Sequence, residues 1–166
     1  EAAQRNAARG FPDIGLFEVG PVYHGARPEA QKTVATLLRV GQNPRHWSGK
    51  PRVTDVYDVK ADALAALAAL GVNVAVLQIT ADAPGYFHPG QSGSLRQGTN
   101  VLATFGTLHP QLLQAYDVTQ AVAGAEIWLD ALPVPKSSGT AKPALILPSL
   151  HAVTRDFAFV VDETVT

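Results

Sequence analysis

The stretch GLFEVGPVYHGARPEAQKTVATLLRVG, residues 15–41, decides the fold of this chain. Its first part, 15–23, is rich in Leu, Phe, Val and Tyr, which favour strands, and Pro21 within it suits an edge strand or a bulge. Residues 24–31 are polar and turn-forming, and 33–41 again has the composition of a strand. Two strands joined by a polar turn predict an antiparallel pair.

The segments that follow complete an α+β pattern. Asp55 can cap a helix that runs to Leu70, with Asp58 in the first turn where the helix dipole favours a negative charge, and Gly71 ends it. One apolar stripe recurs along this helix at steps of three and four: Val56, Val59, Ala63, Leu67 and Leu70. The other expected elements are the tail of a helix at 1–9, a strand at 74–80, a hairpin of 92–97 and 100–108, a short helix opening at Pro110, and a strand at 125–132.

The carboxyl-terminal part of the chain has a different composition. Residues 133–143 (PVPKSSGTAKP) have the Pro, Ser and Gly content of a linker. Beyond them, 155–163 is apolar on both faces, which predicts a central strand. A single strand does not make a domain. Because position 1 is not Met either, we expect a piece of a longer protein whose second module is cut off as it begins.

Composition excludes several classes of protein. A 46% hydrophobic fraction over 166 residues supports a packed core rather than a disordered chain. A net charge of −1 argues against a basic RNA-binding module. The absence of Cys excludes disulfides, thiolate zinc sites and a Cys nucleophile. No apolar run approaches the ~20 residues that cross a bilayer, and no signal peptide opens the chain, so we expect a cytoplasmic protein without a membrane partner.

The histidines and glycines do not form a recognisable site. The five histidines are His24, His46, His88, His109 and His151. None has metal-ligand spacing, so structural roles are favoured, and the imidazoles before Pro89 and Pro110 can cap or pack. The glycines between 85 and 98 match no phosphate-binding pattern and are best interpreted as turn glycines.

Two basic segments allow more than one interpretation. Trp47 lies among Arg45, Lys50 and Arg52, a pattern that fits an RNA or partner contact; a surface loop whose Trp packs on the body is favoured. The pair 155–156 (Arg-Asp) can fix a strand as a salt bridge, which is favoured, or contact phosphate. Residue chemistry alone therefore predicts an α+β domain without an assembled active site.

Six segments, in order and in register, resemble one known family. They are LFEVGPVY (16–23), VYDVKADALAALAALG (56–71), HPGQSGSL (88–95), FGTLHPQLLQAYDV (105–118), AEIWLDAL (125–132) and LPSLHAVTRDFAFVVDETV (147–165). Together they cover nearly the whole chain and are similar to the carboxy-terminal part of the bacterial phenylalanyl-tRNA synthetase β subunit. The resemblance implies that residues 1–142 form a class II synthetase core-like module, an antiparallel sheet flanked by helices. It makes residues 143–166 the linker and start of a truncated ferredoxin-like anticodon-binding domain, whose first strand is 155–162.

The chain departs from catalytic class II synthetases at the positions that bind nucleotide. Active members have a motif of the type FEIGxxFRxE, and its Arg and Glu positions are His24 and Ala26 here. A neutral imidazole cannot give the bidentate, permanently charged grip of a guanidinium on phosphate. Residues 106–110 (GTLHP) match the catalytic subunit, but the strand AEIWLDAL that follows has neither a glycine nor an Arg. We therefore expect a catalytically silent copy of the fold, with no catalytic, cofactor-binding or metal residue in this fragment.

The resemblance implies a structural role within an enzyme that acts elsewhere. The module would support the α subunit of an (αβ)2 heterotetramer, which ligates phenylalanine to tRNA(Phe) with ATP and Mg²⁺; metal-associated carboxylates and an editing site would lie upstream of residue 1. A charged fraction of only 16% suits a large obligate interface. Two alternatives stay open: an independent class II-like enzyme that adenylates a carboxylate with ATP, and a tRNA-binding module that uses the 45–52 loop.

Overall fold

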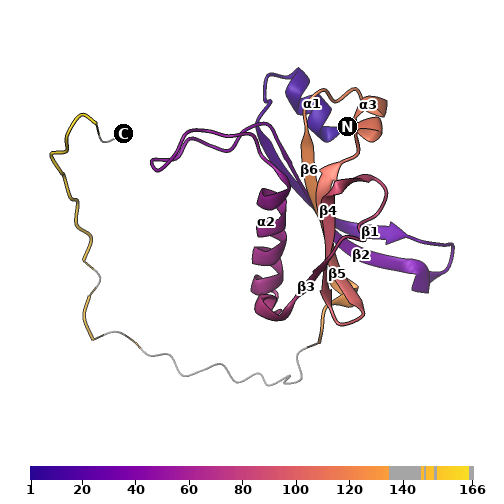
Figure 1. Cartoon of the computed structure of the whole chain (residues 1–166). Coiled ribbons are helices and arrows are strands. Elements are labelled where there is room, and N and C mark those ends of the chain that lie inside the picture. The colour runs from indigo at the N-terminus through magenta and orange to yellow at the C-terminus, as the bar shows by residue number, and fades with distance from the viewer. Residues whose placement is uncertain (135–146, 148, 152, 165–166) are drawn as a thin grey trace. The chain divides into compact units, whose positions relative to one another are not determined.

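A computed structural model describes residues 1–134, 147, 149–151 and 153–164. The chain forms two units, Glu1–Val134 and Pro135–Thr166, and every helix and strand assigned in the described residues lies in the first (Figure 1). The predicted linker, 133–143, lies outside the described residues from 135 onward.

The first unit is built on one antiparallel sheet of six strands in the order β1-β2-β6-β5-β4-β3. The strands are β1 (Ile14–Tyr23), β2 (Gln31–Val40), β3 (Gln78–Thr80), β4 (Phe87–Gln97), β5 (Asn100–Leu108) and β6 (Val122–Trp128). β1 and β2 pair along their whole length, which confirms the predicted hairpin, and β1 is an edge strand, as Pro21 indicates. β6, the last strand in the sequence, lies between β2 and β5.

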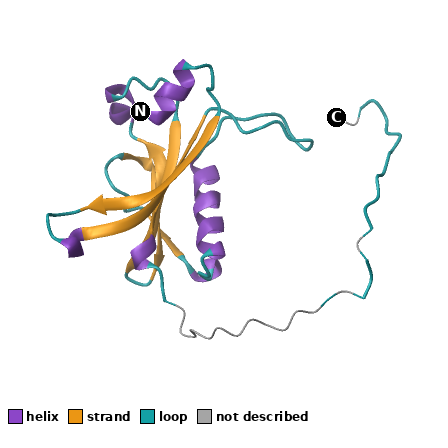
Figure 2. Cartoon of the chain, turned by 180° about the vertical axis from the view of Figure 1, so that it is seen from behind, coloured by secondary structure: helices purple, strands orange, loops and turns teal. Residues whose placement is uncertain are grey.

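The helices divide between the two faces of the sheet. They are α1 (Ala2–Ala8), α2 (Val56–Ala69) and α3 (Pro110–Ala115), with short 3₁₀ turns at Pro28–Ala30, Val74–Val76 and Leu129–Ala131. α2 covers one face, mainly over β5 and β6, whereas α1 and α3 lie together at one end of the sheet (Figure 2). A second small core around Ala3, Val40 and Val122 holds that end.

α2 forms and packs as its sequence predicts. Asp55 caps it, accepting hydrogen bonds from the backbone of Tyr57 and Asp58, and Gly71 follows it with φ +86°. The middle of the predicted stripe is fully buried, through Val59, Ala63 and Leu67. It packs on a sheet core that consists of Leu95, Ala103, Phe105, Ala125 and Ile127. The end of the stripe is not buried, because Leu70 is 51% exposed.

Four predicted strands differ from the structure. The expected 92–97 strand begins earlier, at Phe87. Only 78–80 of the expected 74–80 strand is extended, because the Asn73 side chain accepts from the Ala75 N–H and starts a 3₁₀ turn there. The expected 125–132 strand begins earlier, at Val122, and ends at Trp128. No strand is assigned at 155–163, which is exposed in this structure, so the predicted central strand is not present here. A strand needs a neighbour to pair its backbone groups, and the ferredoxin-like domain that would begin with 155–162 stays a prediction.

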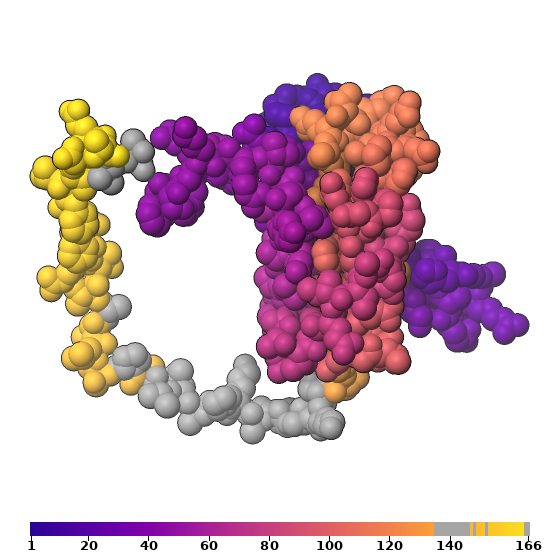
Figure 3. All heavy atoms as spheres, viewed as in Figure 1, coloured from indigo at the N-terminus to yellow at the C-terminus, as the bar shows by residue number. Residues whose placement is uncertain are grey.

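Residues 42–54, here called the arm, stand away from the body of the first unit (Figure 3). The arm links β2 to the start of α2, and the backbone bridges Gln42↔Val53 and His46↔Gly49 hold its two sides together. The predicted loop is therefore a narrow, projecting hairpin.

A pH dependence follows from the base of the arm. Burial alone would raise the pKa of Asp58, but hydrogen bonds from Arg52, from the Asp55 N–H and from Asn43 outweigh it and lower that pKa to about 2. Because the folded-state pKa lies below the ordinary value of 3.8, Asp58 stabilises the fold above that value, and this contribution is lost as the pH falls toward about 2.

We therefore expect the thermal midpoint of the chain to fall between about pH 4 and about pH 2, and to fall less in Asp58→Asn. Circular dichroism melts at several pH values measure this. Glu29→Gln, a change at an exposed carboxylate, is the control and should keep the wild-type profile. An identical acid sensitivity in Asp58→Asn would contradict the assignment.

Candidate functional site on the uncovered face of the sheet

A row of polar side chains crosses the sheet on the face opposite α2. Residues directly opposed in antiparallel strands point to the same face, so the pairing register fixes the row. From β1 to β3 it consists of Glu18, Thr36, Glu126, Thr104, Ser94 and Thr80. Every strand thus contributes one residue to the row, and its members Ser94 and Thr104 are buried. Only the register of non-neighbouring strands reveals this row.

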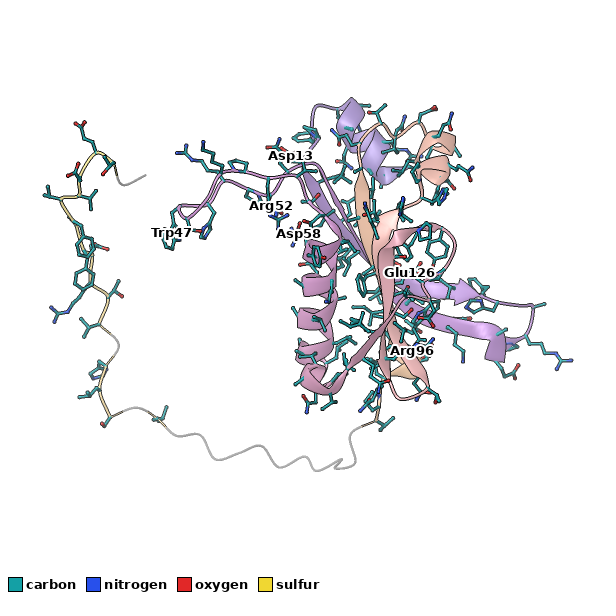
Figure 4. The ribbon with its side chains drawn as sticks, in the orientation of Figure 1. Asp13, Trp47, Arg52, Asp58, Arg96 and Glu126 are labelled. Atoms are coloured by element: carbon teal, nitrogen blue, oxygen red, sulfur yellow. The ribbon has the colours of Figure 1, made fainter. Side chains whose placement is uncertain are left out.

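Glu126, near the middle of this row, accepts a hydrogen bond from a tyrosine. The Tyr86 hydroxyl donates a hydrogen bond to Oε2 of Glu126 (labelled in Figure 4). Burial raises the pKa of Tyr86, and the hydrogen bond and negative charge of Glu126 raise it further. The phenol therefore stays protonated at neutral pH and holds the carboxylate.

Arg96, on the same face, is likewise held by neighbouring side chains of the chain. Arg96 Nε donates to the Thr80 hydroxyl at 2.9 Å, and its Nη2 pairs with Asp82 (Figure 4). Hydrogen bonds from Thr80 and Arg96 lower the pKa of Asp82 to about 2. Asp82 is therefore ionised at neutral pH, and the guanidinium of Arg96 is held by the chain's own groups instead of facing an open phosphate site.

Two opposed glycines lie beside the row, and the chain's own side chains fill the space above them. A Cβ on Gly124 would lie 2.7 Å from Cδ2 of Leu38, and one on Gly106 would lie 3.0 Å from Cδ1 of Phe87. The expectation of a strand without glycine at this place is wrong, because β6 begins three residues earlier than predicted and includes Gly124.

The structure brings His24 next to Trp128, the residue that ends β6. Their ring centroids are 6.0 Å apart and the planes are tilted by 39°. Together with Lys32 and Asp130 they line a cavity of about 370 Å³. Ala26 lies exposed in the turn after β1. His24 therefore lies against an aromatic ring at the one position where the resemblance implies an arginine in active class II synthetases, and an imidazole gives no bidentate grip on phosphate.

The histidines before proline have the structural roles that the sequence favours. His109 caps α3 by accepting from the Gln111 N–H at 3.3 Å, and His88 accepts from the Gly90 N–H at 3.1 Å. Their rings stack with centroids 6.5 Å apart. Within the described ranges, no cluster of three or more His, Cys, Asp or Glu side chains could hold a metal ion. Among the helices of those ranges, none is long and apolar enough to span a membrane.

The six-stranded antiparallel sheet has the fold of solved aminoacyl-tRNA synthetase structures. A pyrrolysyl-tRNA synthetase from Desulfitobacterium hafniense superposes with a TM-score of 0.56 at 17% identity, over 78% of this chain and 43% of that one. A second structure of the synthetase from that organism gives a TM-score of 0.54 at 18% identity, over 77% and 43% of the two chains. At such low identity the likeness shows the fold alone.

The sequence relatives are more specific. The family model "Phenylalanyl tRNA synthetase beta chain CLM domain" matches residues 1–129, so the chain belongs to this family. The phenylalanine–tRNA ligase beta subunit of Rhodospirillum rubrum is 53% identical over 163 residues, which are 97% of this chain and 20% of that protein. The beta subunit of Brucella abortus is 49% identical over 171 residues, 99% of this chain and 21% of its own length. The predicted family is confirmed, and the chain spans about a fifth of the length of these relatives.

Proposed function

We propose that this chain is a non-catalytic structural module of a phenylalanyl-tRNA synthetase β subunit. It supports the α subunit of a cytoplasmic (αβ)2 enzyme that joins phenylalanine to tRNA(Phe) with ATP and Mg²⁺. The observation that carries this proposal is the packing of His24 beside Trp128, at the position where the resemblance implies a nucleotide-binding arginine in active class II synthetases.

The chemistry of adenylation explains why this contact is decisive. Activating a carboxylate with ATP builds negative charge on phosphate, and preorganised cationic donors stabilise that charge. Losing one such donor costs ~10²–10³ in rate, and neither expected arginine is present. Arg96 and Glu126, which could have been recruited, are occupied by Asp82 and Tyr86.

The other face of the edge strand supports an architectural role. Phe17 and Val19 lie opposite Leu37 and Ala35, which pack with the α2 core, so they point to the α2 side of the sheet. α2 lies mainly over β5 and β6, and Phe17 is 84% exposed. Exposed apolar side chains, on a chain of which only 16% of the residues are charged, suit an obligate subunit interface.

We expect the isolated chain to show no ATP–pyrophosphate exchange, and His24→Arg to leave it inactive. One restored guanidinium does not reopen a face that Tyr86, Phe87 and Leu38 fill. The assay uses phenylalanine and other amino acids as substrates, with the complete two-subunit enzyme as the positive control. Robust exchange by the unmodified chain would favour the independent adenylating enzyme instead.

Assembly tests the structural role directly. The chain should co-purify with a co-expressed α subunit, and Phe17→Ser together with Val19→Ser should reduce that recovery. Salt-sensitive binding of tRNA(Phe) by the chain alone, without α binding, would favour the tRNA-binding alternative.

A further inference from the structure

The arm, residues 42–54, contributes no residue to the polar row on the face opposite α2. Its base is nevertheless held by several hydrogen bonds. The Asn43 N–H donates to the Arg52 carbonyl at 2.9 Å, and the Asn43 side-chain amide donates to Asp58 at 3.2 Å. The Arg52 guanidinium donates to both oxygens of Asp58, at 2.9 and 2.7 Å (Figure 4). The base of the arm is therefore tied to the first turn of α2, which restricts the directions in which the arm can project and lowers the entropy lost on binding.

The tip carries an unusually exposed aromatic side chain. Trp47 is 86% exposed, and its aromatic neighbour is His46, with ring centroids 5.5 Å apart. The expectation that Trp47 packs on the body is wrong, because the bridge between His46 and Gly49 turns the chain at the tip, away from the sheet. Val53 and Tyr57, nearer the base, are also exposed. Trp, Tyr and Arg are the residues that most often dominate the binding energy of protein interfaces.

The charges of the arm have one sign. Between 42 and 54 there are three cationic residues and no Asp or Glu. Arg52 is paired with Asp55 and Asp58, whereas Arg45 and Lys50 make no ion pair among the described residues. The surface that complements this tip is an apolar pocket with carboxylates at its rim.

The small positive charge of the arm favours a protein partner over a nucleic acid. Each phosphate contact to a single strand contributes only about 0.7 to the logarithmic salt slope, and two unpaired cations on a chain of net charge −1 supply little of the electrostatic affinity that RNA binding needs. A single buried Trp, in contrast, can anchor a protein interface.

We propose that the arm is a docking arm that inserts Trp47 into an apolar, carboxylate-rimmed pocket on the α subunit. This inference rests on the proposed function, because that function supplies the partner. Arg45 and Lys50 pair with the rim, and the ion pairs of Arg52 keep the arm oriented.

A photo-crosslinking experiment identifies what Trp47 touches. The complete β subunit, with benzoylphenylalanine replacing Trp47, is assembled with the α subunit and tRNA(Phe) and then irradiated. A crosslink to the α polypeptide is expected; the same label at Tyr116, another exposed aromatic position, measures random collision. A crosslink to tRNA, to another β chain or within the same chain, or no crosslink above the Tyr116 level, would overturn the proposal.

Affinity measurements complete the test. Trp47→Ala should weaken α–β association at least tenfold, and Arg45→Glu with Lys50→Glu should weaken it more at low salt than at high salt. Tyr116→Ala should leave the Kd unchanged. Each variant should keep the thermal midpoint of the unmodified chain, since its side chains are exposed. Unchanged affinity of Trp47→Ala overturns the docking arm alone, whereas no association of the unmodified subunits overturns the proposed function.

Discussion

Leu67→Ala should lower the free energy of unfolding by about 2–5 kcal/mol. Leu67 is fully buried where α2 packs on the sheet core, and removing its side chain costs both transfer free energy and a cavity. Since a domain of this size is stabilised by only about 5–15 kcal/mol, the loss is a large share of the total. Urea denaturation of the isolated chain, followed by circular dichroism, measures it.

Leu70→Ala is the matched control on the same helix. It removes the same atoms from a side chain that is 51% exposed, so we expect a change within about 0.5 kcal/mol. Equal losses in the two variants would contradict the burial pattern of α2.

Gly106→Ala should destabilise the chain by about 1–3 kcal/mol and loosen the packing on the face of the sheet opposite α2. The added Cβ would lie 2.5 Å from Cβ of Ser92 and 2.9 Å from the Gln91 carbonyl oxygen, so backbone must shift. Phe87 would move with this segment, and its neighbour Tyr86 would lose the hydrogen bond to Glu126. The raised pKa of Tyr86 should then return toward its ordinary value, which ultraviolet titration of the tyrosines can follow.

Gly15→Ala is the control for the second prediction. Gly15 also lies in a strand, but a Cβ there meets no atom within 4 Å. It should leave both the stability and the tyrosine titration nearly unchanged. A Gly106→Ala variant that behaves like Gly15→Ala would show that the face is not closed by close packing.

The sequence alone was enough to predict the elements that depend only on residues close together in the chain. The Asp55 cap, the buried stripe of α2 and the edge position of β1 each follow from neighbouring residues. The split of the 74–80 strand was missed because the side chain of Asn73, outside that segment, redirects its start. At 155–162, strand composition alone is not enough without a neighbouring strand.

The candidate site was less predictable, because it depends on contacts between distant segments. That His24 replaces an arginine follows from the resemblance, but its packing on Trp128 requires the turn after β1 to meet the end of β6. The hydrogen bond from the Tyr86 hydroxyl to Glu126 joins a loop to a strand that is far from it in the sequence. The exposure of Trp47 was missed because composition does not show whether a hairpin lies along the body or projects from it.

The place of β6 also has a consequence for synthesis on the ribosome. The strands β1–β2 and β3–β4–β5 precede β6 in the sequence, so we expect two separate partial sheets whose β2 and β5 edges, paired in the complete sheet, stay open until residues 122–128 leave the exit tunnel. Unpaired strand edges recruit other chains, so we expect this unit to be most prone to aggregation just before β6 appears. Within Glu1–Val134, β6 is the last strand in sequence order and the one that joins the two halves of the sheet.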